Sequence, residues 1–117
     1  MNKHAPIIYL TKNTIQVTQP VYFNKIELGQ ILNLYGKMVS AGEWRDYSLE
    51  EGVKSISFNI YRRACDQPIY RILKSPQLAS KQGAYAILGQ GRVMIKRGHC
   101  LKTLLKFFNN KLFKVID

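Results

Sequence analysis

The stretch VKSISFNIYRRACDQPIYRILK, residues 53–74, decides the fold. In residues 53–63, Ile, Phe and Ile alternate with Ser, Asn and Tyr, so the apolar side chains all point to one side. Strict alternation of this kind is typical of a β-strand with one buried face. Residues 69–74 form a second β-rich segment after the loop at 64–68. Together the two segments predict a β-hairpin.

An amphipathic helix is predicted on each side of this hairpin. Asn24 opens the first helix, with Glu27 placed three residues later for a capping box, and Gly42 ends it. The second helix follows Gly98. The apolar stripe of the first helix is Leu28, Ile31, Leu32, Tyr35, Met38 and Val39. That of the second is Leu101, Leu104, Leu105, Phe108, Leu112 and Val115. Gly29 and Gly36 edge the first stripe, indicating either a closely packed neighbouring backbone or tolerated glycines.

Shorter segments complete the expected sheet. Residues 84–88 and 92–97 flank Gly89-Gln90-Gly91, which is typical of a hairpin loop. Residues 6–10 and 15–23 are rich in β-formers. By contrast, residues 48–52 resemble a turn, and 76–82 are irregular, with room for one helical turn.

These elements predict a single α+β domain over residues 1–117. Its core is an antiparallel sheet of four to six strands with two amphipathic helices packed on one face. Residues 1–19 form a β-rich N-terminal extension, and residues 109–117 form a basic tail of the last helix.

Charge is the unusual property of this chain. Its 117 residues include 18 Lys and Arg against 7 Asp and Glu, a formal net charge of +11. Residues 1–66 hold 8 basic and 6 acidic side chains, whereas residues 67–117 hold 10 basic ones and only Asp117. Such a field attracts phosphates or other acidic partners. Solubility alone is the alternative explanation.

Several protein classes are disfavoured. No apolar run approaches the roughly 20 residues of a membrane span, and the N-terminus lacks a signal-peptide cleavage site. Cys65 and Cys100 are too few for a disulfide scaffold. We therefore expect a cytoplasmic protein without a membrane partner.

No motif in the chain fixes an enzymatic activity. Residues 89–92 lack the Lys-Ser/Thr of a phosphate-binding loop, and Cys65, His99 and Cys100 lack the paired spacing of a zinc site. The acidic cluster in residues 43–51 has no flanking sugar-binding pattern. The sequence predicts no catalytic residue, cofactor or metal, and favours a non-enzymatic role without deciding it.

A basic binding module is the leading hypothesis, with nucleic acid as its partner. Cations and aromatics cluster on the two predicted hairpins, where aromatic rings stack bases and cations hold phosphates. The candidate nucleic-acid-binding residues are Tyr61, Arg62, Arg63, Tyr70, Arg71, Lys74, Arg92, Lys96 and Arg97. Alternation along a strand turns half of them toward the core. Two alternatives therefore stay open: that Tyr70 and Tyr85 are buried, and that Arg71 bridges to an internal carboxylate such as Asp46 or Glu43.

A protein-interaction or regulatory module is the second hypothesis. In this case the basic half docks an acidic protein, or two copies of the chain pair through a strand edge. Phe107 and Phe113 favour it, because they lie off the apolar stripe of the last helix among lysines. The sequence leaves the oligomeric state open.

Several strings resemble a small alphaproteobacterial domain family of unknown function. They are Leu34-Tyr35-Gly36-Lys37-Met38-Val39, Ala41-Gly42-Glu43-Trp44-Arg45-Asp46-Tyr47, Tyr61-Arg62-Arg63-Ala64, Pro68-Ile69-Tyr70-Arg71-Ile72, Gln82-Gly83-Ala84-Tyr85 and Lys96-Arg97-Gly98-His99. The resemblance covers roughly residues 20–108. It implies a bacterial, cytoplasmic, single-domain protein, and it carries over no activity, cofactor or site. Whether the Trp44–Asp46 segment is structural or functional stays open.

Overall fold

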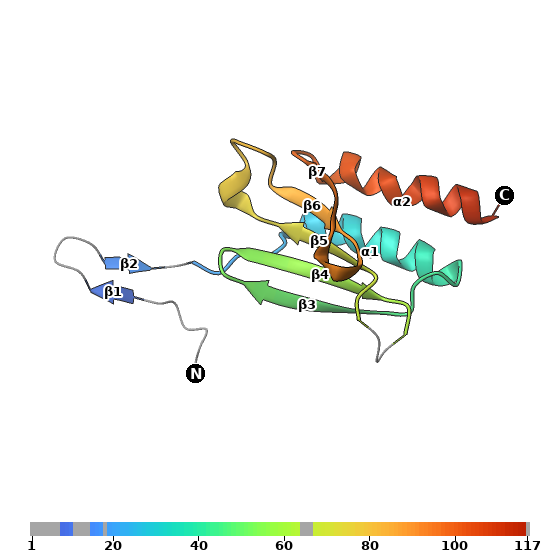
Figure 1. Ribbon diagram of the computed structural model, residues 1–117, viewed down its shortest axis with the longest axis horizontal. Helices are drawn as coiled ribbons and strands as arrows, with labels where there is room; N and C mark the ends of the chain where they lie inside the picture. Colours follow the sequence, from blue (N-terminus) through green and yellow to red (C-terminus); the bar gives the residue numbers. More distant parts are fainter. Residues whose placement is uncertain (1–7, 11–14, 18, 64–66, 117) are drawn as a thin grey trace.

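The computed structural model describes residues 8–10, 15–17, 19–63 and 67–116, with side chains for 19–63 and 67–110. Its body is one antiparallel sheet covered by two helices (Figure 1). The five strands lie in the sheet in their sequence order: β3 (Asp46–Gly52), β4 (Ser55–Tyr61), β5 (Tyr70–Lys74), β6 (Tyr85–Leu88) and β7 (Met94–Gly98). The predicted α+β fold, with four to six antiparallel strands, is confirmed.

Helices α1 (Lys25–Ser40) and α2 (Leu101–Ile116) pack on the same face of the sheet and run side by side in the same direction (Figure 1). No helix in the described ranges is long and apolar enough to cross a membrane. One core joins the helices to the sheet, because alternation sends the apolar side chains of the central strands toward them. Its fully buried members include Ile31, Phe58, Ile60, Ile72, Ile87 and Phe108.

Helix α1 begins as predicted. Asn24 accepts from the Glu27 backbone N–H at 2.8 Å, and the Glu27 side chain accepts from the Asn24 backbone N–H at 2.8 Å, which completes the capping box. Its buried face is rotated from the predicted stripe, since Leu34 is buried while Leu32 and Val39 are exposed. The sheet covers only part of the stripe, because β3 is its edge strand on this side.

Strand β3 corrects the prediction of a turn at residues 48–52. The chain instead turns at Val53 and Lys54, and β3 pairs with β4 along its whole length. The sequence did not indicate a strand because β3 lies at the sheet edge, with most of its side chains exposed. Its apolar Tyr47 is held by stacking on Phe58, with ring centroids 4.6 Å apart.

The connections differ in smaller ways from the predictions. The one helical turn within 76–82 is confirmed as the 3₁₀ helix η1 (Pro76–Leu78), and a second, η2 (Gln90–Arg92), delays the start of β7 to Met94. Strands β1 (Ile8–Leu10) and β2 (Ile15–Val17) form a separate two-stranded sheet that projects from the body (Figure 1). The strand predicted for residues 15–23 therefore ends early, and residues 19–24 form no regular element.

Candidate functional site

The structure distributes the nine predicted binding residues over several places. Tyr70 lies on the face that the helices cover, half-buried, with its ring centroid 4.9 Å from Phe108 and 6.5 Å from Trp44. Phe107 packs edge-on against Tyr70 from α2. The Tyr70 ring is thus engaged in the core. Phe107 is also packed rather than exposed, and the Phe113 side chain lies outside the described side chains.

Lys74 is tied to the start of α1. Its Nζ donates to Glu27 Oε1 at 2.7 Å and to the Tyr22 carbonyl at 2.8 Å, and Tyr85 Oη donates to Glu27 Oε2. Glu27 is only 6 % exposed. Burial by itself raises the pKa of the Glu27 carboxyl, but the hydrogen bonds from Lys74, Tyr85 and the Asn24 backbone outweigh burial, so the net pKa lies below its usual value. Burial, followed by the hydrogen bond to Glu27, raises the pKa of Tyr85 to about 12. This cluster fastens α1 to the sheet.

The opposite face of the sheet carries a hydrogen-bonded network of polar side chains over β3, β4 and β5. Arg71 Nη1 donates to Glu50 Oε1 at 2.6 Å and to Asn59 Oδ1 at 3.2 Å, and Asn59 Nδ2 donates to the same Glu50 oxygen at 3.0 Å. Ser57 Oγ donates to Asn59 Oδ1. Register explains the grouping, because Glu50 opposes Ser57, and Asn59 opposes Arg71, across adjacent strands. Arg71 therefore bridges to a carboxylate, but the carboxylate is Glu50, whose side chain is 48 % exposed, and not the internal Asp46 or Glu43 considered from the sequence.

Tyr61 and Arg92 extend this network. Tyr61 shares a hydrogen bond of 3.0 Å with Ser48, and Arg92 Nη2 lies 3.7 Å from Glu50 Oε2. The β6–β7 connection that carries Arg92 thus lies over this face of the sheet (Figure 1). The hydrogen bond from Asn59 is the main cause that lowers the pKa of Glu50. With a charged carboxylate surrounded by donors, the network is a self-satisfied structural unit.

The two remaining residues of the second hairpin are also separated. Lys96 is exposed on the edge strand β7, whereas Arg97 is half-buried and its Nη1 donates to the Gly83 carbonyl at 3.0 Å. Contacts within the fold thus engage Tyr61, Tyr70, Arg71, Lys74, Arg92 and Arg97.

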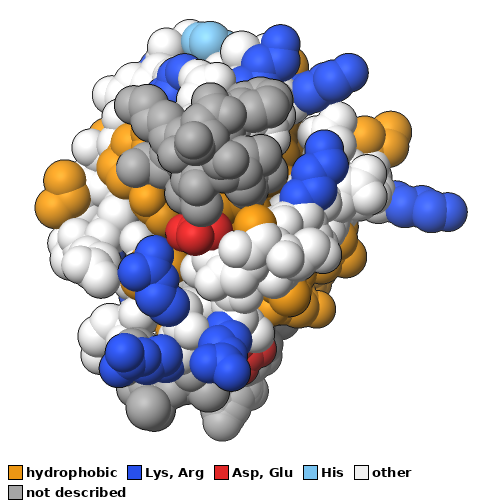
Figure 2. Space-filling model, turned by 90° about the vertical axis from the view of Figure 1, so that its right-hand side faces the viewer, with side chains coloured by type: hydrophobic (Ala, Val, Ile, Leu, Met, Phe, Trp, Pro, Cys, Tyr) orange, Lys and Arg blue, Asp and Glu red, His pale blue; other side chains and the backbone are white. Residues whose placement is uncertain are grey.

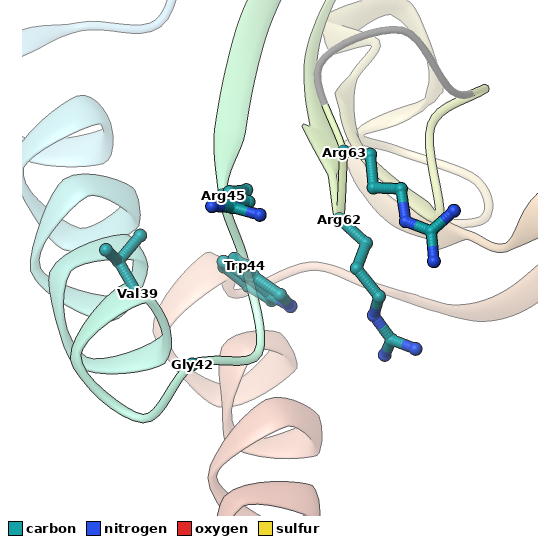
Figure 3. A pocket seen from close by; sticks show the side chains of 6 residues that line it. All are labelled: Val39, Gly42, Trp44, Arg45, Arg62 and Arg63. Carbon is teal, nitrogen blue, oxygen red and sulfur yellow. The ribbon is translucent and has the colours of Figure 1, made fainter.

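Arg62 and Arg63 lie at one end of the sheet, where Arg45 lines the same pocket. They line a pocket of about 480 Å³ together with Val39, Gly42, Trp44 and Arg45. Figure 3 shows the side chains of Arg62 and Arg63 extending from the end of β4, opposite Val39 at the end of α1, with Trp44 and Arg45 between them. Guanidinium groups are suited to bind phosphate and carboxylate oxygens through several N–H groups.

The turn at the end of α1 positions this pocket. Gly42 adopts a left-handed φ of 79°, and the Glu43 and Trp44 backbone N–H groups donate to the Met38 carbonyl at 2.9 and 3.3 Å. Glycine, which lacks a Cβ, takes this left-handed conformation at little cost. The chain then enters the sheet, where the Arg45 N–H donates to the Tyr61 carbonyl at 2.8 Å. This bond places Arg45 beside Arg62.

In the segment 44–46, Trp44 is part of the core, whereas Arg45 and Asp46 lie on the surface. Trp44 is 3 % exposed and packs edge-on against Phe108, with centroids 5.1 Å apart. Arg45 points out and lines the pocket, and Asp46 is exposed at the start of β3. Sequence reasoning missed Arg45 because the arginine lies 17 residues before Arg62. The only indication in the sequence was strand alternation: if Trp44 is buried where a strand begins, the next residue, Arg45, points the other way.

Positive charge dominates the surface around the pocket. Arg62 Nη2 lies 3.8 Å from Glu43 Oε1, and the Arg62 side chain remains 61 % exposed. At that distance and exposure the pair is weak. Figure 2, which looks onto this end of the molecule, shows many Lys and Arg side chains and few acidic ones. An anion that enters the pocket thus meets a favourable field.

The chain belongs to a family described as a protein of unknown function, DUF2794, whose model matches residues 21–105. The match confirms the resemblance to a family of unknown function. It includes α1, the five-stranded sheet and all six pocket residues, and leaves β1 and β2 outside. No curated protein and no solved structure shows significant similarity to the chain.

Proposed function

We propose that this domain binds nucleic acid, with Arg45, Arg62 and Arg63 as its phosphate contacts. One observation carries the proposal: three arginines from two chain segments line a single pocket at an end of the molecule rich in Lys and Arg (Figures 2 and 3). Phosphate contacts by Lys and Arg supply most of the affinity of proteins for nucleic acid. The earlier stacking role of Tyr70 is not retained, because its ring is packed in the core.

The proposal predicts a specific loss of binding on removal of the pocket charges. Fluorescence anisotropy with labelled single-stranded RNA, single-stranded DNA and duplex DNA at three salt concentrations provides the measurement. We expect the double variant Arg62→Ala, Arg63→Ala to bind at least tenfold more weakly. Each lost phosphate contact also reduces the salt dependence, so the slope of log K against log salt should fall by about 1.4 for a single strand.

A matched control removes two charges elsewhere. Lys25 begins α1, a helix length of about 24 Å from the pocket. Lys54 lies in the turn at the other end of β4 from Arg62, and its φ of 62° is one that asparagine tolerates. The variant Lys25→Gln, Lys54→Asn should bind nucleic acid within about twofold of wild type, because the loss of two distant charges weakens the overall field only slightly. Equal losses in the two double variants would mean that net charge, and not the pocket, binds nucleic acid.

Self-association through the sheet edges is the second candidate function. Within the described residues, no strand pairs with the outer edge of β3 or β7. β3 carries Asp46, Glu50 and Glu51, whereas β7 carries Lys96 and Arg97, so the edges are complementary in charge. Exposed apolar residues lie on both, including Leu49 at 52 % on β3. The partner that fits either edge is a second copy of the chain.

Light scattering coupled to size exclusion tests this candidate. Pairing of β3 with β7 of another copy predicts a mass that rises with protein concentration at moderate salt. The variant Leu49→Lys should remain a monomer, because a lysine on an exposed edge opposes strand addition. A monomeric mass for the wild type over the whole concentration range would exclude the candidate.

A further inference from the structure

We propose that the pocket receives one unstacked base of a single-stranded nucleic acid, with the indole of Trp44 as hydrogen-bond donor to that base. This inference rests on the proposed function and refines it, because it names the form of nucleic acid and the part of the nucleotide that enters the pocket. Three features support it: an unused donor in the lining, an uncharged part of the lining, and arginines that lie around the opening.

The unused donor is the indole N–H of Trp44. Trp44 lines the pocket, yet it is only 3 % exposed, and its ring packs against the rings of Tyr35, Tyr70 and Phe108. Among the described residues no acceptor bonds to its Nε1, and Figure 3 shows this nitrogen at the tip of the ring, on the side toward which Arg62 extends. A buried donor without a partner is costly, and an acceptor on a bound molecule would satisfy it.

The uncharged part of the lining suits a base better than a phosphate. Val39, Gly42 and Trp44 carry no charge, and the Val39 side chain is 39 % exposed at the end of α1. A base has apolar faces, and each of the bases carries an acceptor on an edge. Such a lining can hold the face of a base while Trp44 donates to its edge. Because every base can accept this bond, the pocket is expected to tolerate different sequences.

The size of the pocket points to a single strand. Its volume of about 480 Å³ lies within the range of roughly 300–1,000 Å³ that holds small ligands, so it has room for one base. A base enters such a pocket only after it has left its stack, and this costs least in a single strand. In a duplex the bases remain paired and present only their edges in the grooves.

The arginines are placed for a strand that passes over the pocket. Figure 3 shows the arginine side chains spread around the pocket, on two chain segments. Arg45 is exposed, and the Arg62 side chain is 61 % exposed. A base within a strand has one phosphate on each side, so two separated cations can contact both phosphates. Arg63 also lines the pocket, but it has an interaction of its own within the chain, and this arrangement does not require its charge.

The test compares single-stranded DNA 12-mers that have identical backbones. One strand is oligothymidylate, one is abasic at every position, and one is abasic except for a single central thymine. All three carry the same number of phosphates, so they differ only in their bases. At about physiological salt, anisotropy should show at least tenfold tighter binding of the oligothymidylate than of the abasic strand. The strand with one thymine should bind at least threefold more tightly than the abasic strand.

The fluorescence of Trp44 reports on the pocket directly, because the chain contains only this tryptophan. A base in contact with an indole quenches its emission. At saturation we expect the oligothymidylate to remove at least about a quarter of the emission. The abasic strand, and a stable duplex of the same length, should each remove less than about a tenth.

Two variants assign the preference for bases to the pocket. Trp44→Phe removes the N–H and keeps an aromatic ring, whereas Val39→Ser removes the apolar wall at a half-exposed position that tolerates a polar residue. Each variant that keeps the wild-type circular dichroism should reduce the preference for oligothymidylate over the abasic strand at least threefold. Val53→Ser is the matched control, since Val53 is 84 % exposed in the turn at the other end of β4, and it should leave the preference unchanged.

The outcomes separate this inference from the proposed function. Equal binding of the oligothymidylate and the abasic strand would overturn the inference and leave the proposed function standing, because phosphate contacts alone would then account for the affinity. A preference that persists in full in a folded Trp44→Phe or Val39→Ser variant would also overturn the inference. So would a duplex that quenches Trp44 as strongly as the single strand does. No binding of any strand would overturn both.

Discussion

Replacement of Glu27 by alanine should lower the free energy of unfolding by about 3–5 kcal/mol, because the variant leaves the Lys74 ammonium poorly solvated and without its carboxylate. The Lys74 side chain is 15 % exposed and the Glu27 side chain 8 %. The same change removes the acceptor of Tyr85 Oη and half of the capping box. Urea unfolding followed by circular dichroism gives the measurement.

Glu43→Ala is the matched control for this change. Glu43 also pairs with an arginine, but the distance is 3.8 Å and the Arg62 side chain is 61 % exposed. Pairs with such exposure contribute at most about 1 kcal/mol. If Glu27→Ala costs no more than Glu43→Ala, the cluster of Glu27, Lys74 and Tyr85 does not stabilise the fold as inferred.

Acid should diminish the difference between wild type and Glu27→Ala. The folded-state pKa of Glu27 is lowered from its ordinary value, so the carboxylate contributes stability above the unfolded pKa of about 4.3. That contribution is lost as the pH falls through the folded-state pKa. The gap in unfolding free energy should therefore be constant near neutrality and shrink at pH values below about 4.3. A gap that widens in acid would contradict the direction of the shift.

Local patterns were sufficient to predict most of the elements. The capping box at Asn24 and the alternation of residues 53–63 each act within one segment, and both elements form as expected. β3 was missed because a strand at the edge of a sheet needs few apolar residues and obtains its hydrogen bonds from β4. Its residues therefore carry little local indication of a strand.

The candidate site was only partly predictable for a related reason. Arg62 and Arg63 stood out by their adjacency in the sequence, but alternation alone does not say which partners a side chain will find. The partners of Lys74 and Arg71 are Glu27 and Glu50, which lie 47 and 21 residues away. Two residues predicted as phosphate contacts thus form ion pairs with carboxylates of the same chain.

The glycines on α1 show the same limit. The spacing of Gly29 and Gly36 left open a closely packed backbone, but a Cβ built at either position meets nothing within 4 Å. The tolerated-glycine alternative therefore holds for both positions. The glycine that does permit a close approach is Gly83, in a loop whose sequence gave no such indication.

Gly83→Ala should lower the free energy of unfolding by roughly 2–4 kcal/mol, through backbone strain and overpacking together. Gly83 has a φ of +108°, and a Cβ there would lie 2.4 Å from the Gly98 carbonyl oxygen and 2.5 Å from its carbonyl carbon. Both obstacles are backbone atoms, and Gly98 is held in register opposite Tyr85. The start of β6 and the end of β7 would have to move apart.

Gly36→Ala is the matched control, because the same substitution there should change the free energy of unfolding in the opposite direction. Gly36 lies within α1 in open space, so alanine there should raise the free energy of unfolding by about 0.5–1 kcal/mol through helix propensity. The same chemical change thus acts in opposite directions at the two sites, and urea unfolding distinguishes them. A Gly83→Ala protein as stable as wild type would mean that β6 and β7 separate at little cost. That result would also remove the reason to treat the Arg97 contact with the Gly83 carbonyl as a structural tie.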